Sequence, residues 1–123
     1  MLPAARRITR AAEFRTVYRQ GRKVGSRALV LYWRANNKGY TRFGFSVSKK
    51  IGRSVVRNRC KRLLREACRR HLTSFRPGFD VVLVAREGIK GLGFKEVMAE
   101  VLTLSQKAKL LVDSAEEGAE KSG

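Results

Sequence analysis

The residues best suited to chemistry lie in one short block of the chain. Between Lys49 and Arg70 there are ten basic side chains and one acid, Glu66. Most of the basic residues are arginines, whose planar guanidinium groups suit bidentate contacts to phosphate and stacking on exposed bases. A solvated helix face normally mixes charges of both signs, and this block does not. The composition therefore predicts a surface that binds the phosphates and sugars of a nucleic acid.

The sequence offers no comparable set of residues for catalysis by the protein itself. A general acid–base ribonuclease needs two proton carriers, and His71 is the single histidine. A two-metal nuclease needs clustered carboxylates, whereas Asp80 and Asp113 are far apart and the glutamates are scattered. The glycines at 88, 91 and 93 are not followed by the Lys-Ser/Thr pair of a phosphate-binding loop. We expect no catalytic residue, no metal site and no cofactor bound by the chain.

The charge of the whole chain supports a polyanionic partner. The net charge is +18 on 123 residues. Residues 1–76 carry 22 basic and 2 acidic side chains, and residues 77–123 carry 6 and 8. Such charge strains a compact domain unless a polyanion neutralises it. A membrane surface would need apolar residues free to enter lipid, and here these are committed to a predicted core. We expect no membrane partner.

The cysteines and the N-terminus bear on redox state and location. Cys60 and Cys68 are eight residues apart in a predicted helix, which separates them by roughly 12 Å. A disulfide needs Cα atoms within about 7 Å, so both are expected to be core thiols. Without a Cys-x-x-Cys pair, a structural zinc site is not expected. The N-terminus has no apolar stretch typical of a secretory signal, and we expect a cytoplasmic protein.

The positions of apolar residues predict the elements that carry the basic block. A helix is expected over 11–20, with Thr9 as N-cap and Gly21 as its stop. Strands are expected over 28–33 and 42–48, joined by a hairpin turn at 36–39. In the second strand, the face formed by 44, 46 and 48 is small and polar, so another backbone could lie close to it.

Two further helices and a strand complete the predicted domain. In a helix over 55–72, the apolar stripe contains Val56, Cys60, Leu63, Leu64, Ala67 and His71, and the opposite face contains Asn58, Lys61, Arg62, Arg65 and Arg69. A buried strand is expected over 81–85 and a last helix over 94–112. The order is α-β-β(-β)-α-β-α, a two-layer α/β (α+β) sandwich in one domain over 1–113. Residues 114–123 are expected to form a disordered acidic tail.

Two segments of the block resemble a known family. Residues 45–52, Phe-Ser-Val-Ser-Lys-Lys-Ile-Gly, and 56–65, Val-Arg-Asn-Arg-Cys-Lys-Arg-Leu-Leu-Arg, resemble the signature "RNR" region of the bacterial ribonuclease P protein. Weaker likenesses at 13–21, 30–32 and 77–86 occur in the family's order. Phe43 and Cys60 stand where the family often has aliphatic residues, and both keep the position apolar. The resemblance covers roughly residues 6–112.

The resemblance implies a fold and a function. The fold would be similar to a domain of ribosomal protein S5, with a left-handed βαβ crossover, whereas about 98% of such crossovers are right-handed. The function would be that of the protein subunit of ribonuclease P, which helps a catalytic RNA with bound Mg²⁺ to remove the 5′ leader of precursor tRNA. The protein alone would be inactive.

The resemblance also implies which residues bind which RNA. The catalytic RNA would contact the RNR region, at Lys50, Arg53, Arg57, Asn58, Arg59, Lys61, Arg62, Arg65 and Arg69. The single-stranded 5′ leader of the precursor tRNA would lie in a cleft lined or bordered by Phe14, Tyr18, Tyr32, Ser46, Ser48, Lys49 and Arg86. Stacking on aromatic side chains beside positive charge is the usual way to hold single-stranded RNA.

Other interpretations stay open at this stage. From spacing alone, Phe14 and Tyr18 are more often core residues than a binding surface. A structural ribosomal protein or general RNA chaperone would share the charge. A DNA-binding helix-turn-helix protein would need a second helix close before the basic one, but residues 42–48 predict a strand there. We therefore expect no DNA partner.

Overall fold

The computed structural model describes residues 2–112. Its main elements are α1 (Ala11–Gln20), β1 (Arg22–Gly25), β2 (Leu29–Ala35), β3 (Arg42–Ser46), α2 (Ser54–Arg70), β4 (Phe79–Ala85) and α3 (Phe94–Lys107). The predicted α-β-β(-β)-α-β-α order is confirmed, with β1 as the additional strand. No helix in residues 2–112 has the length and apolarity needed to cross a membrane. The predicted acidic tail, 114–123, lies outside the described residues.

The four strands form one mixed sheet in the order β1-β2-β4-β3. Strand β2 is antiparallel to both β1 and β4, whereas β3 is parallel to β4. The predicted hairpin between β2 and β3 is therefore wrong, because β4 lies between them. The predicted turn does form, with positive φ at Asn37 and Gly39, but the chain then crosses the end of β4. At this crossing the backbone N–H of Asn36 donates to the Gly78 carbonyl over 2.8 Å.

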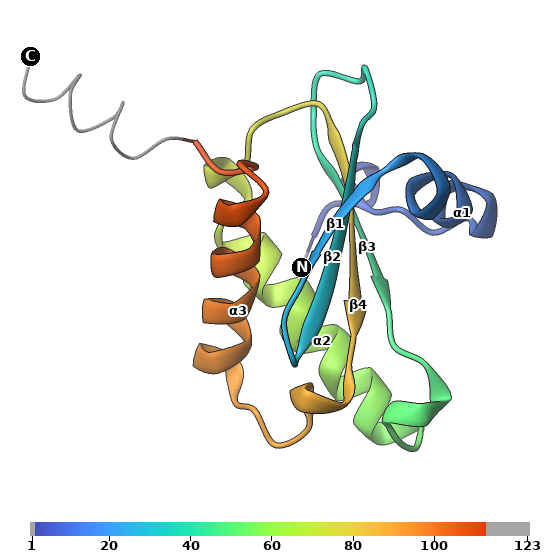
Figure 1. Cartoon of the computed structure of the whole chain (residues 1–123), viewed down its shortest axis with the longest axis vertical. Coiled ribbons are helices and arrows are strands. Elements are labelled where there is room, and N and C mark those ends of the chain that lie inside the picture. The colour runs from blue at the N-terminus through green and yellow to red at the C-terminus, as the bar shows by residue number, and fades with distance from the viewer. Residues whose placement is uncertain (1, 113–123) are drawn as a thin grey trace, which may run out of the picture.

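Helices cover the two faces of the sheet unequally. Helices α2 and α3 lie on one face and α1 lies on the other (Figure 1). Helix α2 connects the parallel neighbours β3 and β4 as a βαβ crossover. The left-handedness of this crossover, which the family resemblance implies, stays a prediction.

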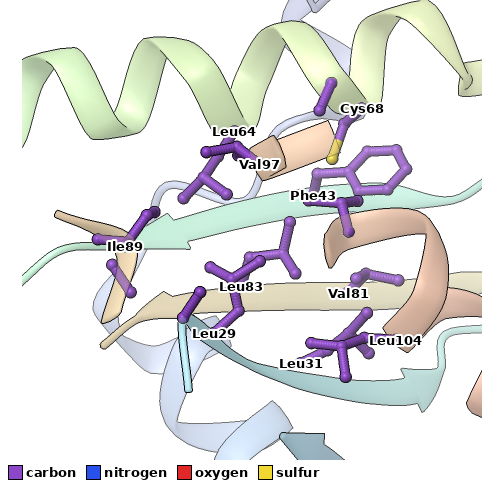
Figure 2. Close-up of a cluster of buried hydrophobic side chains, with 14 of the residues drawn as sticks. Leu29, Leu31, Phe43, Leu64, Cys68, Val81, Leu83, Ile89, Val97 and Leu104 are labelled. Carbon is purple, nitrogen blue, oxygen red and sulfur yellow. The ribbon is translucent and has the colours of Figure 1, made fainter. Parts of the chain in front are cut away.

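The main core lies between the sheet and the pair α2 and α3. Alternate residues of the strands point into it, including Leu29 and Leu31 of β2 and Leu83 of β4 (Figure 2). On α2 the predicted apolar stripe is confirmed at Cys60, Leu64 and Ala67, and Cys68 is buried with them. Both cysteines are free, as predicted. Burial raises the pKa of each thiol above its usual range, so both behave as apolar core groups.

Two predicted helix boundaries need correction. Arg10, not Thr9, is the N-cap residue of α1, and no side chain caps the helix there. Helix α3 ends at Lys107 and not at 112, because Lys109 adopts a left-handed backbone with φ 59°. That turn directs Leu110 into the core, where it is fully buried. The Leu110 carbonyl accepts a 2.7 Å hydrogen bond from the backbone N–H of Arg76. The apolar pattern continued past the helix because the following segment is also buried.

Gly21 ends α1 as predicted, and the structure shows why the position favours glycine. Its N–H donates to the Val17 carbonyl over 2.8 Å. A Cβ atom at Gly21 would lie 2.5 Å from the Val17 oxygen and 2.6 Å from the Trp33 oxygen. The close approach sets where β1 begins beside β2, and therefore where α1 sits over the sheet.

Candidate nucleic-acid interface

Helix α1 covers only part of its face of the sheet. Val17 of α1 is buried with Ile8 and Val82, and Phe14, Tyr32 and Val84 are packed around them and partly exposed. The helix crosses the strands, since Phe14 contacts Gly44 of β3 and Tyr18 contacts Tyr32 of β2, so it covers only one part of their length. The rest of this face stays open, and the half-exposed aromatic side chains lie at the boundary.

A charged cluster fixes α1 to the strands. The guanidinium of Arg42 on β3 makes two hydrogen bonds with Asp80 on β4, Nε to Oδ1 over 2.9 Å and Nη2 to Oδ2 over 2.8 Å. Its Nη1 donates to Glu13 of α1 over 2.8 Å. Asn36 adds a 2.9 Å hydrogen bond to Asp80. Sequence reasoning missed this cluster, although an arginine on the otherwise small, uncharged face of β3 was a usable signal.

The cluster keeps Asp80 ionised. Burial by itself raises the pKa of this carboxyl, but the hydrogen bonds from Arg42 and Asn36 outweigh burial and hold the pKa below its ordinary value. The same contacts raise the pKa of the Arg42 guanidinium further above its usual range. Both members of the pair therefore stay charged, and their orientation positions the first turn of α1.

The small face predicted for β3 is confirmed, and α1 uses it. The ring of Phe14 lies directly over Gly44, where a Cβ atom would be 2.8 Å from the ring. Any larger residue at this position would lift Phe14 from the sheet. Glycine thus allows the aromatic ring to lie close to the backbone of β3.

The predicted aromatic residues lie side by side, and we call Phe14, Tyr18 and Tyr32 the aromatic shelf. The ring centroids of Phe14 and Tyr18 are 6.3 Å apart, and those of Tyr18 and Tyr32 are 4.9 Å apart in an edge-to-face arrangement. Tyr18 is 38% exposed, so it is not the core residue that its spacing favoured. Partial burial raises the pKa of its phenol, which the Ser46 side chain partly offsets. The phenol is thus a neutral hydrogen-bonding group beside an apolar surface.

Next to the shelf, the open part of the sheet forms a floor. Strand register aligns Ser46 with Val84, Val84 with Val30, and Val30 with Gly25 across the sheet. The first three are only half-buried, because α1 crosses the sheet beside them rather than over them. Val30 and Val84 were not among the predicted site residues. Val30 could have been found, since it shares a face with Tyr32.

The remaining predicted cleft residues lie at the end of this floor. Ser48 and Lys49 are exposed just past β3. Arg86 follows β4, and its Nη1 donates to the Ser26 carbonyl over 3.0 Å. The floor therefore continues from the aromatic shelf to a border of polar and positive groups.

Lys61 and Arg65 of α2 join the shelf to the basic helix. A hollow of about 470 Å³ contains Phe14, Tyr18, Ser46 and Lys61 in its lining. An adjoining hollow of about 240 Å³ is lined by Arg7, Phe14, Lys61 and Arg65 among others. The Nε atoms of Arg7 and Arg65 are buried and have no hydrogen-bond partner within residues 2–112. Positive charge thus lines the same hollows as the aromatic ring of Phe14.

Helix α2 brings together four of the nine predicted RNR residues, and we call Asn58, Lys61, Arg62 and Arg65 the basic face. They line one shallow hollow of about 420 Å³ together with Val55. In the part of the chain that the structure describes, none of the three cations of this face forms an ion pair. Lys50 and Arg53 are exposed in the preceding loop and helix cap.

The other three predicted RNR residues point elsewhere. Arg57 donates to the Gly52 carbonyl over 3.2 Å and to Ser54 over 3.1 Å, which closes the loop before α2. Arg59 reaches the Leu92 carbonyl over 3.3 Å. Arg69 pairs with Glu66 through Nε over 2.8 Å. The helical repeat predicts on which side of the helix a residue lies. The position of the guanidinium at the end of a long side chain, however, depends on which hydrogen-bond acceptors are nearby.

Glu66 neutralises the C-terminal end of α2. Hydrogen bonds from Arg69 and then Arg70 lower the pKa of its carboxyl to about 2. Arg70 also lies over the ring of Phe94 at 4.8 Å. The residues 2–112 contain no cluster of three or more histidine, cysteine or acidic side chains able to hold a metal ion. The arrangement suits binding of RNA.

Comparisons with known proteins match most of the chain to one family. The family model described as ribonuclease P matches residues 2–109. The ribonuclease P protein component of Clostridium kluyveri is 43% identical over 106 residues, covering 85% of this chain and 95% of that protein. The component of Alkaliphilus metalliredigens is 39% identical over 105 residues, with the same two coverages.

Solved structures share the fold. The RNase P protein of Staphylococcus aureus superposes with a TM-score of 0.79 at 32% identity, covering 87% of this chain and 98% of that chain. The RNase P protein of Thermotoga maritima gives a TM-score of 0.75 at 28% identity, covering 80% of this chain and 93% of that one.

Proposed function

The chain belongs to the ribonuclease P protein family and is a subunit of the endoribonuclease that processes the 5′ leader of tRNA precursors, and on this premise we propose that its two surfaces bind different RNAs. The aromatic shelf and the floor beside it hold the single-stranded leader. The basic face, with Lys50 and Arg53 before it, contacts the catalytic RNA. The protein supplies binding and orientation, while the RNA supplies the chemistry with Mg²⁺ at the scissile phosphate.

One observation carries the proposal: Lys61 and Arg65 line hollows on both surfaces. Bases stacked on Phe14 and Tyr18 would have their phosphates beside these cations, at the edge of the helix that meets the catalytic RNA. Stacking contributes ~1–3 kcal/mol per base with little sequence preference. This suits leaders of many sequences joined to tRNAs of one shape. We propose a cytoplasmic location for the complex, because the N-terminus has no apolar stretch typical of a secretory signal.

A reconstitution tests the role of the whole protein. Precursor-tRNA cleavage is measured at near-physiological Mg²⁺ with a bacterial ribonuclease P RNA, with and without this protein. We expect leader removal only when both are present, and no cleavage by the protein alone. An equally basic unrelated protein serves as control. If it restores cleavage equally well, the effect is bulk charge screening and the proposal fails.

The leader site is tested by Phe14→Ala in the holoenzyme. Loss of one stacking surface should weaken affinity for precursor tRNA by roughly 5- to 150-fold. Affinity for mature tRNA, which lacks the leader, should stay unchanged. Gel-shift or filter binding with both tRNAs measures the two values. Equal weakening of both would contradict the leader assignment, since it would show a general loss of the fold or of RNA binding.

A further inference from the structure

Val55 is exposed in an unusual place. It lies in the first turn of α2, and 77% of its surface is exposed. Within residues 2–112 the other exposed large apolar residues, Val56, Tyr18 and Val112, have about half that exposed fraction. A single exposed valine is ordinary on a protein surface. This one, however, lines the hollow formed by the four residues of the basic face. An apolar group at this point has to be explained together with the cations around it.

Phosphate binding alone does not use such a valine. A phosphate oxygen is best satisfied by guanidinium and ammonium groups, and the methyl groups of Val55 offer it nothing. The hollow also contains Asn58, whose amide both donates and accepts hydrogen bonds. It therefore combines an apolar patch, one group able to read a hydrogen-bonding edge, and cations that stay unpaired within the described chain.

A nucleobase presents the matching chemistry. Its face is apolar and its edge carries donors and acceptors, while phosphates lie on either side along the backbone. In a paired helix the base faces are covered by stacking, so only an unstacked base can offer its face to a side chain. RNA loops, bulges and ends supply such bases, and protein recognition of RNA sequence uses them.

We propose that the hollow on α2 receives one unstacked nucleobase of the catalytic RNA. Val55 lies against the face of the base, Asn58 meets its edge, and Arg62 and Arg65 hold the adjacent phosphates. This inference rests on the proposed function, in which the basic face contacts the catalytic RNA, and it names the RNA feature recognised there. The base contact adds specificity to a surface that otherwise reads only charge.

The first test compares Val55→Thr with Arg62→Ala by measuring affinity for the catalytic RNA over a series of salt concentrations. Threonine keeps the branched shape and replaces one methyl by a hydroxyl. We expect binding to weaken about four-fold, the factor for one methyl-sized group withdrawn from water, with the salt dependence unchanged. Arg62→Ala should instead flatten the log–log salt slope by about 0.7–0.9, the value for one lost phosphate contact. Val112→Thr, at an exposed valine whose backbone N–H donates to the Ser74 carbonyl beyond the opposite end of α2 from Val55, should leave binding unaltered.

The outcomes separate the two proposals. If Val55→Thr has no effect while Arg62→Ala weakens binding, the nucleobase inference is overturned and the assignment of the basic face stands. If neither variant changes affinity for the catalytic RNA, both are overturned. A change of salt slope in Val55→Thr would also overturn the inference, because it would show a disturbed phosphate contact.

Cross-linking gives a second and independent test. Val55→Cys places a reactive thiol in the hollow, where a thiol-directed photo-crosslinker can be attached. The native Cys60 and Cys68 are buried and their thiol pKa values are raised, so they should not compete. Within the full ribonucleoprotein we expect a cross-link concentrated on one unpaired nucleotide. Val112→Cys serves as the control position. Cross-links confined to base-paired nucleotides would overturn the inference.

Discussion

The two faces of the sheet are held in different ways. The face under α2 and α3 is closed by a large apolar cluster, in which Leu83 and Leu64 are fully buried. Within residues 2–112 the apolar cluster between the other sheet face and α1 has three buried members, Ile8, Val17 and Val82, and the helix is also fixed by the Arg42 ion cluster. The comparison shows that one face provides most of the stability. The other keeps aromatic side chains half-exposed because a single short helix covers it.

The largest effect on stability is expected from Arg42→Met, on the face under α1. The substitution leaves Asp80 buried without its charged partner, which should lower the free energy of unfolding by about 3–5 kcal/mol. It also releases Glu13, and with it the first turn of α1, so affinity for the leader should fall in the folded fraction. Urea unfolding measures the stability, with the exposed Arg22→Met as control. A loss no larger than that of the control would show that the cluster does not hold α1.

Acidification sharpens the same test. The pKa of Asp80 in the folded protein lies below its ordinary value, so the unfolded chain binds more protons as the pH falls. The ionised Asp80 contributes its full share to the free energy of unfolding above about pH 5. That share declines as the pH falls through about 3.9, the ordinary pKa in the unfolded chain, towards the lower pKa in the folded protein. Without Arg42 the folded pKa is no longer lowered in this way. The variant should therefore lose less of its remaining stability between pH 5 and pH 3, measured by urea unfolding at each pH.

On the opposite face, Leu83→Ala should lower stability without a specific effect on the leader. Truncating this fully buried side chain should cost about 2–5 kcal/mol. Affinity for precursor tRNA, corrected for the folded fraction, should match the wild type, since Leu83 faces away from α1. Thermal unfolding and tRNA binding on the same preparation provide both values. A leader-specific loss would mean that the two faces are not independent.

The smallest effects distinguish two arginines one turn apart on α2, one on the basic face and one paired with Glu66. Arg65→Gln removes a cation that has no ion pair within residues 2–112, and it should weaken catalytic-RNA binding and flatten the salt slope by about 0.7–0.9. Arg69→Gln removes a cation already paired with Glu66, and the slope should change by less than half as much. Binding isotherms at four salt concentrations measure the difference. Equal slopes would show that RNA displaces Glu66 and binds Arg69 as well as Arg65.

Many features of the two sheet faces can be predicted from local sequence patterns. The others depend on contacts between residues far apart in the chain. The apolar repeat located α1 and the buried stripe of α2, and alternation in β3 indicated that Gly44 lies on a small face that another part of the chain can approach closely. The hairpin prediction failed because the turn at 36–39 carries no information about β4, which comes more than forty residues later. Arg69, which the helical repeat places with the basic face, instead pairs with Glu66, and Arg59, which only the family resemblance assigned to RNA binding, donates to the Leu92 carbonyl. A helical repeat does not contain that information.

The position of β4 has a consequence for the order of events during synthesis. This strand is central to the sheet, yet it is the last strand to leave the ribosome, so β3 lacks its neighbouring strand until residues 79–85 have emerged. A nascent chain up to that point can form the β1–β2 ribbon and helices α1 and α2, but it lacks α3 and cannot close either core. Its many cations are then accessible on an incomplete domain. Cooperative folding therefore begins only when about two-thirds of the chain is present, with its slow step set by pairing between distant segments.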